Sequence, residues 1–288
     1  MRGIKRAAGK IVVLVPLAIL AALIAIGPGG LISYTPETRV GVHSVIAFWI
    51  SIPVALSVLA FVKKQSYSGI WLMSAMIFPM VIHIGSAALN ILRIDIEEEP
   101  VVRIISDSVA DLLELSIFGL LLVVACVGFS IKSRSSFKPI PTFILLPIFL
   151  ILPAAIFGGT WFLIFPNLDL ESLMGISLMF GIVAISGFVI SALIVPRIRD
   201  SGPPIDAGYF ISSVMLFAVS ALTILLTLSE PSIYWELAET LQMAGYLLLA
   251  LAMGVPFLKR AGFKRAPSYG ITLGLILLAY LPFLITIA

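Results

Sequence analysis

The chain has 288 residues, of which 60% are hydrophobic and only 11% are charged, and its mean hydropathy is +1.16. This composition excludes an ordinary soluble domain and indicates an integral membrane protein. The formal net charge of +3 and the pI near 9.0 come from basic loop residues, so they are no evidence for nucleic-acid binding.

Nine apolar runs are long enough to cross a hydrocarbon layer of ~30 Å, and they predict an all-α fold of about nine transmembrane helices. The first run could also be a signal peptide, with Ala25-Ile-Gly27 as a weak cleavage site. We expect instead an uncleaved N-terminal anchor helix within residues 1–30. The expected spans are residues 11–27, 43–62, 69–92, 110–131, 142–165, 173–195, 207–228, 235–257 and 269–287.

The basic residues predict the orientation of the chain in the membrane. All but three of the 18 lysines and arginines lie in alternate loops; the exceptions are Arg39, Arg93 and Arg103. The positive-inside rule therefore places the N-terminus in the cytoplasm and, after nine spans, the C-terminus outside the plasma membrane. No lysine or arginine falls inside an expected span, which argues against a buried arginine for an anionic substrate.

Two acidic segments indicate a duplication. Residues 111–114 (DLLE) recur as residues 236–239 (ELAE), and residues 136–141 (SFKPIP) resemble residues 262–267 (GFKRAP) at nearly the same spacing. We expect two parallel four-helix repeats, made of helices 2–5 (residues 31–165) and helices 6–9 (residues 166–288). Because each repeat has an even number of helices, the two copies enter the membrane in the same orientation.

The two acids of each segment differ in their expected roles. Ser108 and Asp111 have capping-box spacing, so we expect Asp111, and likewise Glu236, to be capping or solvated acids at the outer interface. Glu114 and Glu239 lie about 4.5 Å deeper, at ~1.5 Å rise per residue. Their spacing allows either an interfacial position or a buried cation- or proton-binding site.

Other polar residues fall at a similar expected depth and are candidates to line the same site. His83 and Asn90 share one face of their helix, and Gln242 and Tyr246 extend the polar face of Glu239. A single histidine on an apolar face is more often a hydrogen-bonded core residue. Near acids it becomes a candidate proton relay, because imidazole titrates near neutral pH.

The sequence contains no recognised catalytic motif, so an enzymatic role has no support from motifs. His43 and His83 are the two histidines, which excludes multi-haem ligation, and we expect them to lie apart because His43 falls at the edge of a span. No cofactor is predicted. The carboxylates would suit a hard cation or a proton, and the identity of any metal stays open.

The leading functional hypothesis is a small secondary transporter with an outward-facing site. In it Glu114 and Glu239 carry a proton or cation, and Asp111 and Glu236 form an electrostatic entrance. Two alternatives remain: a non-enzymatic membrane sensor or assembly subunit that acts through a partner, and a quinone-reacting membrane anchor of a respiratory complex. The last of these is a fold-level analogy.

The expected partners are the lipid bilayer and either a second copy of the chain or another membrane-complex subunit; nucleic acid is not expected. Small residues at 177 and 181, and again at 187 and 191, predict close helix packing. That packing could lie within the chain or at a dimer seam.

Overall fold

The computed structural model describes residues 36–64, 67–92, 100–130, 142–198, 205–228 and 231–260. The regular elements in these ranges are all helical, so the expectation of an all-α fold is confirmed. The predicted anchor in residues 1–30 and the predicted span 269–287 lie outside the described residues. The α-helices are α2 (Pro36–Lys64), α3 (Tyr67–Leu92), α4 (Pro100–Ser130), α5 (Thr142–Gly159), α6 (Leu170–Ile194), α7 (Ala207–Thr227) and α8 (Pro231–Arg260).

Six of the described helices, all except α5, are long and apolar enough to cross a membrane. α5 belongs to a shorter apolar stretch, which continues through a π-helical turn at Thr160–Ile164 and a 3₁₀ turn at Phe165–Asn167. Many large apolar side chains face outward along these helices, which is the arrangement that a lipid environment favours. The chain is thus a multi-pass membrane protein.

Local sequence signals explain where several helices begin. α2, α4 and α8 each begin at a proline, which lacks the backbone N–H that a first helical turn leaves unpaired. α6 and α7 begin after aspartates that act as N-caps. Asp169 accepts a hydrogen bond from the backbone N–H of Ser172, and Asp206 accepts from Gly208 and Tyr209.

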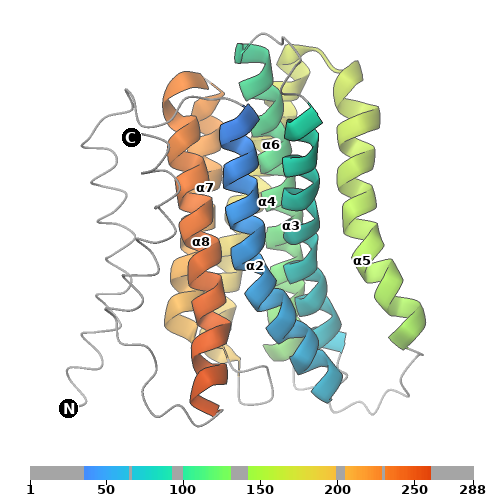
Figure 1. Ribbon diagram of the computed structural model, residues 1–288, viewed down its shortest axis with the longest axis vertical. Helices are drawn as coiled ribbons and strands as arrows, with labels where there is room; N and C mark the ends of the chain where they lie inside the picture. The colour runs from blue at the N-terminus through green and yellow to red at the C-terminus, as the bar shows by residue number, and fades with distance from the viewer. Residues whose placement is uncertain are drawn as a thin grey trace, which may run out of the picture.

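The helices form one bundle whose centre is α4 (Figure 1). α4 packs against α3, α6, α7 and α8, whereas α5 lies at the edge of the bundle, mainly against α3. α2, α4, α6 and α8 all begin at the end drawn at the top of Figure 1. We call this the Arg39 end, because Arg39 lies there in the first turn of α2.

Glycines allow α4 and α6 to approach closely. A Cβ atom on Gly187 would lie 2.9 Å from the carbonyl carbon of Gly119, and one on Gly119 would lie 3.3 Å from the carbonyl oxygen of Ala184. Further along α6, Gly181 lies against Leu225 of α7. The small residues of α6 are therefore used in packing within the chain.

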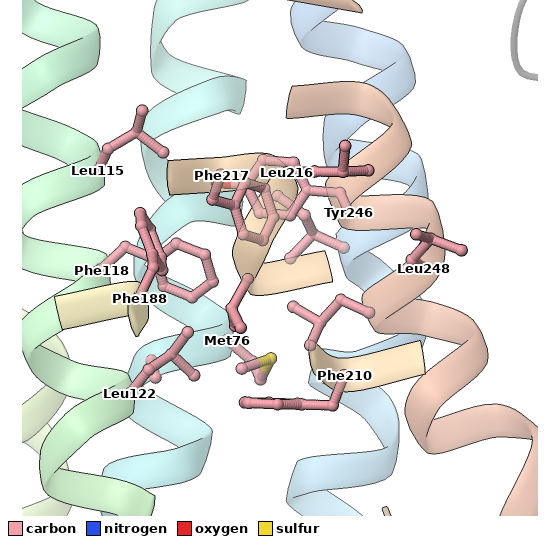
Figure 2. Packing of buried hydrophobic residues seen from close by; sticks show 14 of the residues in the cluster. Met76, Leu115, Phe118, Leu122, Phe188, Phe210, Leu216, Phe217, Tyr246 and Leu248 are labelled. Atoms are coloured by element: carbon pink, nitrogen blue, oxygen red, sulfur yellow. The ribbon is translucent and has the colours of Figure 1, made fainter. Parts of the chain in front are cut away.

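An aromatic cluster fills the middle of the bundle (Figure 2). Phe118 of α4, Phe188 of α6, Phe217 of α7 and Tyr246 of α8 are fully buried, and their contacting ring centroids lie 4.6–5.8 Å apart. Such ring pairs add ~0.5–1.5 kcal/mol each beyond the burial of their area. Phe118 follows Glu114 by one helical turn, so this rigid cluster directly adjoins the acidic residues.

Candidate functional site

Two helices begin earlier than the sequence predicted. α2 begins at Pro36 and α4 at Pro100, where we expected spans to begin at residues 43 and 110. The prediction that no lysine or arginine falls within a span is wrong, because Arg39 begins the first spanning segment of the described residues and is only 3% exposed. Charged residues in these first turns lower the local hydropathy, and contacts between helices offset their burial.

Arg39 binds three carboxyl groups from two other helices. Its Nη1 donates to Oε1 of Glu239 on α8 at 3.0 Å, and its Nη2 to Oδ1 of Asp111 on α4 at 3.4 Å. Its Nε lies 3.5 Å from Oδ2 of Asp107, one turn before Asp111. The Trp235 ring lies 5.8 Å from the guanidinium carbon, within cation–π distance. We call Arg39, Asp107, Asp111 and Glu239 the arginine layer.

A second set of contacts lies one turn further into the bundle. Nδ1 of His43 on α2 and Nδ1 of His83 on α3 are 2.8 Å apart and form a hydrogen bond. Nε2 of His83 lies 3.1 Å from Oε1 of Glu114, at ion-pair distance but without the alignment of a good hydrogen bond. Tyr246 Oη donates to the same oxygen at 3.2 Å. We call these four residues the histidine layer.

The two layers are adjacent because α2, α4 and α8 run in the same direction and each contributes to both. The paired contributions are Arg39 and His43 from α2, Asp111 and Glu114 from α4, and Glu239 and Tyr246 from α8. All of these side chains are buried. Glu114 lies ten residues beyond Ile104, where the spanning part of α4 begins, so it is ~15 Å inside that segment.

The layers contain more acid than base. Asp107, Asp111, Glu114 and Glu239 are buried against one guanidinium, and Arg39 is the only buried lysine or arginine whose side chain the structure describes. If all four acids were ionised and both imidazoles neutral, the negative charge of this set would exceed the charge of Arg39 by three. Because isolated buried charges are strongly disfavoured, such an excess of acid favours the uptake of protons or cations.

Several buried polar atoms near the layers have no hydrogen-bond partner among the described residues. An unpaired buried donor or acceptor costs about 1–3 kcal/mol, so a cluster of them needs an explanation. The atoms are His43 Nε2, Glu239 Oε2, Gln242 Nε2, Asn90 Oδ1 and Ser108 Oγ. They provide both donors and acceptors that water, protons or a polar ligand could satisfy.

The structure brings together most of the residues that the sequence singled out. Glu114, Glu239, Asp111, His83 and Tyr246 all belong to the two layers. Gln242 is buried on α8 one turn beyond Glu239. Asn90 is also buried, but it donates to the backbone carbonyl of Ser86 on its own helix. The side chain of Glu236 lies outside the described residues.

The predicted capping role of Asp111 is wrong. Ser108 and Asp111 lie in the interior of α4, which begins at Pro100, and both are buried. Asp111 binds Arg39 instead of the backbone of a first helical turn. The expected separation of the two histidines is also wrong, since His43 lies seven residues inside α2 and contacts His83 directly.

Sequence reasoning missed Arg39, His43 and Asp107 as members of the site. A signal was present, because Arg39 and His43 are spaced i, i+4, and Asp107 and Asp111 have the same spacing. Both pairs share a helix face. Arg39 and Asp107 were missed because they precede the apolar runs that set the expected span boundaries, and His43 was missed because it lies at the edge of its run.

The described residues contain no group of three or more His, Cys, Asp or Glu side chains arranged to hold a metal ion. In the arginine layer, the position between the carboxyl groups is taken by the guanidinium of Arg39. A hard cation would therefore have to displace Arg39 or bind elsewhere.

Comparison of the chain with protein-family models, with curated protein sequences and with solved structures finds no match.

Proposed function

We propose that this chain is a small secondary transporter of the plasma membrane, coupled to a proton or cation, with Glu114 and Glu239 as the carrier groups. The observation that carries this proposal is the burial of four carboxyl groups around a single arginine, where α2, α4 and α8 meet. Intramembrane ionisable residues are costly and typically mark ion or substrate pathways.

The pairing of the helices supports two related units that could move against each other. In the proposed repeat, α2 corresponds to α6, α3 to α7 and α4 to α8. Each main contact between two helices then has an equivalent contact between the corresponding helices, and that contact is also observed. Thus α2–α3 becomes α6–α7, α3–α4 becomes α7–α8, and α2–α8 becomes α6–α4. We extend this to nine helices: an N-terminal anchor and two parallel four-helix repeats, the second completed by residues 269–287.

The arginine layer would couple ion binding to movement of these units. Arg39 belongs to the proposed first unit and Glu239 to the second, and their ion pair joins the two. Protonation of Glu239, or a cation bound to it, weakens its attraction for Arg39 and favours a state in which the units separate. A ligand shifts such an equilibrium by its differential affinity for the two states.

The proposed orientation places the Arg39 end outside. Basic residues gather at the opposite end, where α2 ends at Lys63 and Lys64 and α8 ends at Lys259 and Arg260; the positive-inside rule assigns such an end to the cytoplasm. Glu236 would then lie one turn outside Glu239 and act as the electrostatic entrance. Asp111, by contrast, would act within the arginine layer.

Proteoliposomes that contain the full chain and an internal pH indicator test this proposal. Gradients of a panel of solute classes and of Na⁺ are imposed one at a time, and proton or Na⁺ movement is recorded. We expect at least one solute gradient to drive ion movement. The double variant Glu114→Gln, Glu239→Gln should abolish this movement, whereas Glu171→Gln, an exposed acid of α6, should leave it unchanged. Wild-type flux in the double variant would end the proposal.

The aromatic cluster gives one reason to keep a membrane sensor as the second candidate. It adjoins the histidine layer with tightly packed rings, so charge changes in the layers could be transmitted by packing instead of by transport. A stoichiometric membrane partner that copurifies with the chain, together with no flux for any solute, would favour the sensor.

A further inference from the structure

The two histidines of the chain are joined directly to each other. Their Nδ1 atoms lie 2.8 Å apart, and both rings are 1% exposed. Such a bond requires one Nδ1 to carry the proton and the other to accept it, which makes the two imidazoles different tautomers. The histidines are thus a proton donor–acceptor pair.

The outer atoms of this pair extend it in both directions. At one end, Nε2 of His83 lies 3.1 Å from Oε1 of Glu114, at ion-pair distance. At the other end, Nε2 of His43 is buried and has no partner among the described residues. One end of the chain of contacts is therefore a carboxylate, and the other is an open nitrogen at which a proton can arrive.

We propose that His43, His83 and Glu114 form a proton wire, and that the proton is accordingly the coupling ion of the transporter. The second part of this inference rests on the proposed function; the wire itself does not. In the starting state His43 carries its proton on Nδ1, His83 carries its proton on Nε2, and Glu114 is ionised.

One transfer moves one proton and changes both tautomers. A proton binds Nε2 of His43, and the Nδ1 proton of His43 passes to Nδ1 of His83. The Nε2 proton of His83 then passes to Oε1 of Glu114. The products are two neutral imidazoles with exchanged tautomers and a neutral carboxyl group, so the net result is one proton delivered to Glu114. Release of that proton and reversal of the tautomers reset the wire.

The groups packed around the wire act on an added proton in opposite directions, because the Arg39 guanidinium opposes it and the acids favour it. Arg39 lies one turn from His43 on α2, and α4 and α8 face the site with Asp107, Asp111 and Glu239. The acids exceed Arg39 in charge, so an added proton reduces the imbalance of the buried site. Tyr246 donates to Oε1 of Glu114, which stabilises the ionised form that accepts the proton.

The aromatic cluster blocks the wire on its far side. Tyr246 packs against Phe118 and Phe217 with centroids 5.8 and 4.6 Å away. In the next turn of α4, Ser116 is the one polar side chain, and its hydroxyl donates to the backbone carbonyl of Leu113. The aromatic rings therefore block a proton on Glu114 unless the helices move. A transporter needs this property, because an unbroken path would let protons leak through the membrane.

Because these are the two histidines of the sequence, ¹⁵N-histidine labelling of the full chain gives only four ring nitrogens to assign. Solid-state NMR in lipid bilayers then reads the tautomers directly. We expect one protonated and one unprotonated Nδ1, with a scalar coupling between them. The wire would be overturned if, at every pH tested, the two Nδ1 atoms were both protonated or both unprotonated and showed no scalar coupling.

Substitution of Glu114 tests whether the histidine pair contacts this carboxyl group. Glu114→Gln should shift the Nε2 resonance of His83 and retain the coupling between the imidazoles, whereas Glu171→Gln should leave all four nitrogens unchanged. An unchanged His83 resonance in a folded Glu114→Gln protein would contradict the contact on which the wire depends. If the Glu114→Gln protein does not fold, the wild-type spectrum still shows whether the two imidazoles are hydrogen-bonded to each other.

Flux measurements test the identity of the coupling ion separately from the transporter proposal. Solute-driven proton movement in the absence of Na⁺, lost in His83→Gln, supports the proton as coupling ion. Flux that requires Na⁺ and persists in His83→Gln overturns that assignment while the transporter proposal stands. If the imidazole coupling is intact but no solute drives any flux, both the transporter proposal and the proton as its coupling ion are overturned. The wire itself then stands, as a proton-binding site that a sensor would use.

Discussion

Arg39 and Glu239 are 200 residues apart in the sequence, yet Nη1 of Arg39 donates to Oε1 of Glu239 at 3.0 Å in the buried interior. The same guanidinium also contacts Asp107 and Asp111. It therefore joins α2 to both α4 and α8, and it is the main positive charge that opposes the acids of the bundle.

Removal of Arg39 should strongly destabilise the protein. Arg39→Ala leaves three buried carboxyl groups without their cation, and breaking a buried ion pair from one side costs about 3–5 kcal/mol. Lys259→Ala, at an exposed position of α8, should change the free energy of unfolding little. Unfolding in lipid–detergent micelles, followed by tryptophan fluorescence, measures both. A raised pH should enlarge the loss in Arg39→Ala, because ionised acids then repel one another; equal stability of the two variants would contradict the arginine layer.

The relationship between Arg39 and Glu239 also marks the limit of prediction from the sequence. Helix-forming apolar runs are local, so the all-α membrane fold could be predicted. Glu114, Glu239, His83 and Tyr246 could be placed near one another, because helical spacing aligns polar residues on a face. The partner of a buried charge is a tertiary property, so the local spacing of Arg39 and His43 could not identify the acids that Arg39 binds.

The same cause explains the two misplaced span boundaries. Asp107 lowers the hydropathy of the early turns of α4, and Arg39 does so in α2. A local reading treats these residues as solvated, whereas the structure pairs them with one another. The misplaced span boundaries and the failure to find the arginine layer therefore have the same cause, which is that the partners of these charged residues lie on other helices.

Close approach of α4 and α6 should be sensitive to one methyl group. A Cβ on Gly187 meets the backbone of Gly119 at 2.9 Å, which side-chain rotation cannot relieve. Gly187→Ala should destabilise by about 1–3 kcal/mol, as overpacking does. Gly175→Ala provides the matched control, since Gly175 is in the same helix and has nothing within 4 Å of its Cβ position. Thermal unfolding should separate the two variants; a Gly187→Ala protein as stable as the control would show that the helices are not in contact there.

The start of α6 should contribute stability that depends on pH. Hydrogen bonds from the side chain and backbone of Ser172 hold the pKa of Asp169 below its ordinary value of 3.8. A lowered folded pKa means that the contribution is present above that ordinary value and is lost as the pH falls through the folded pKa. Asp169→Ala should therefore be less stable than wild type at neutral pH, and the difference should shrink in acid. Amide hydrogen exchange at the first turn of α6 measures it, and a difference that grows in acid would contradict the cap.

Two substitutions of Tyr246 should distinguish its contribution to the packing of the bundle from its contribution to the hydrogen bonds of the histidine layer. Its ring is part of the aromatic cluster, while its hydroxyl donates to Oε1 of Glu114 at 3.2 Å. Tyr246→Phe keeps the ring and removes the hydrogen bond, and loss of a bond to a charged group costs about 1.5–3 kcal/mol. The fold should persist, but the carboxyl bands of Glu114 in infrared difference spectra should shift in frequency, because Oε1 has lost a hydrogen bond. Tyr246→Leu removes the ring contacts as well and should be less stable than Tyr246→Phe. If Tyr246→Phe leaves the infrared bands of Glu114 unchanged while Tyr246→Leu unfolds the bundle, Tyr246 has a packing role alone.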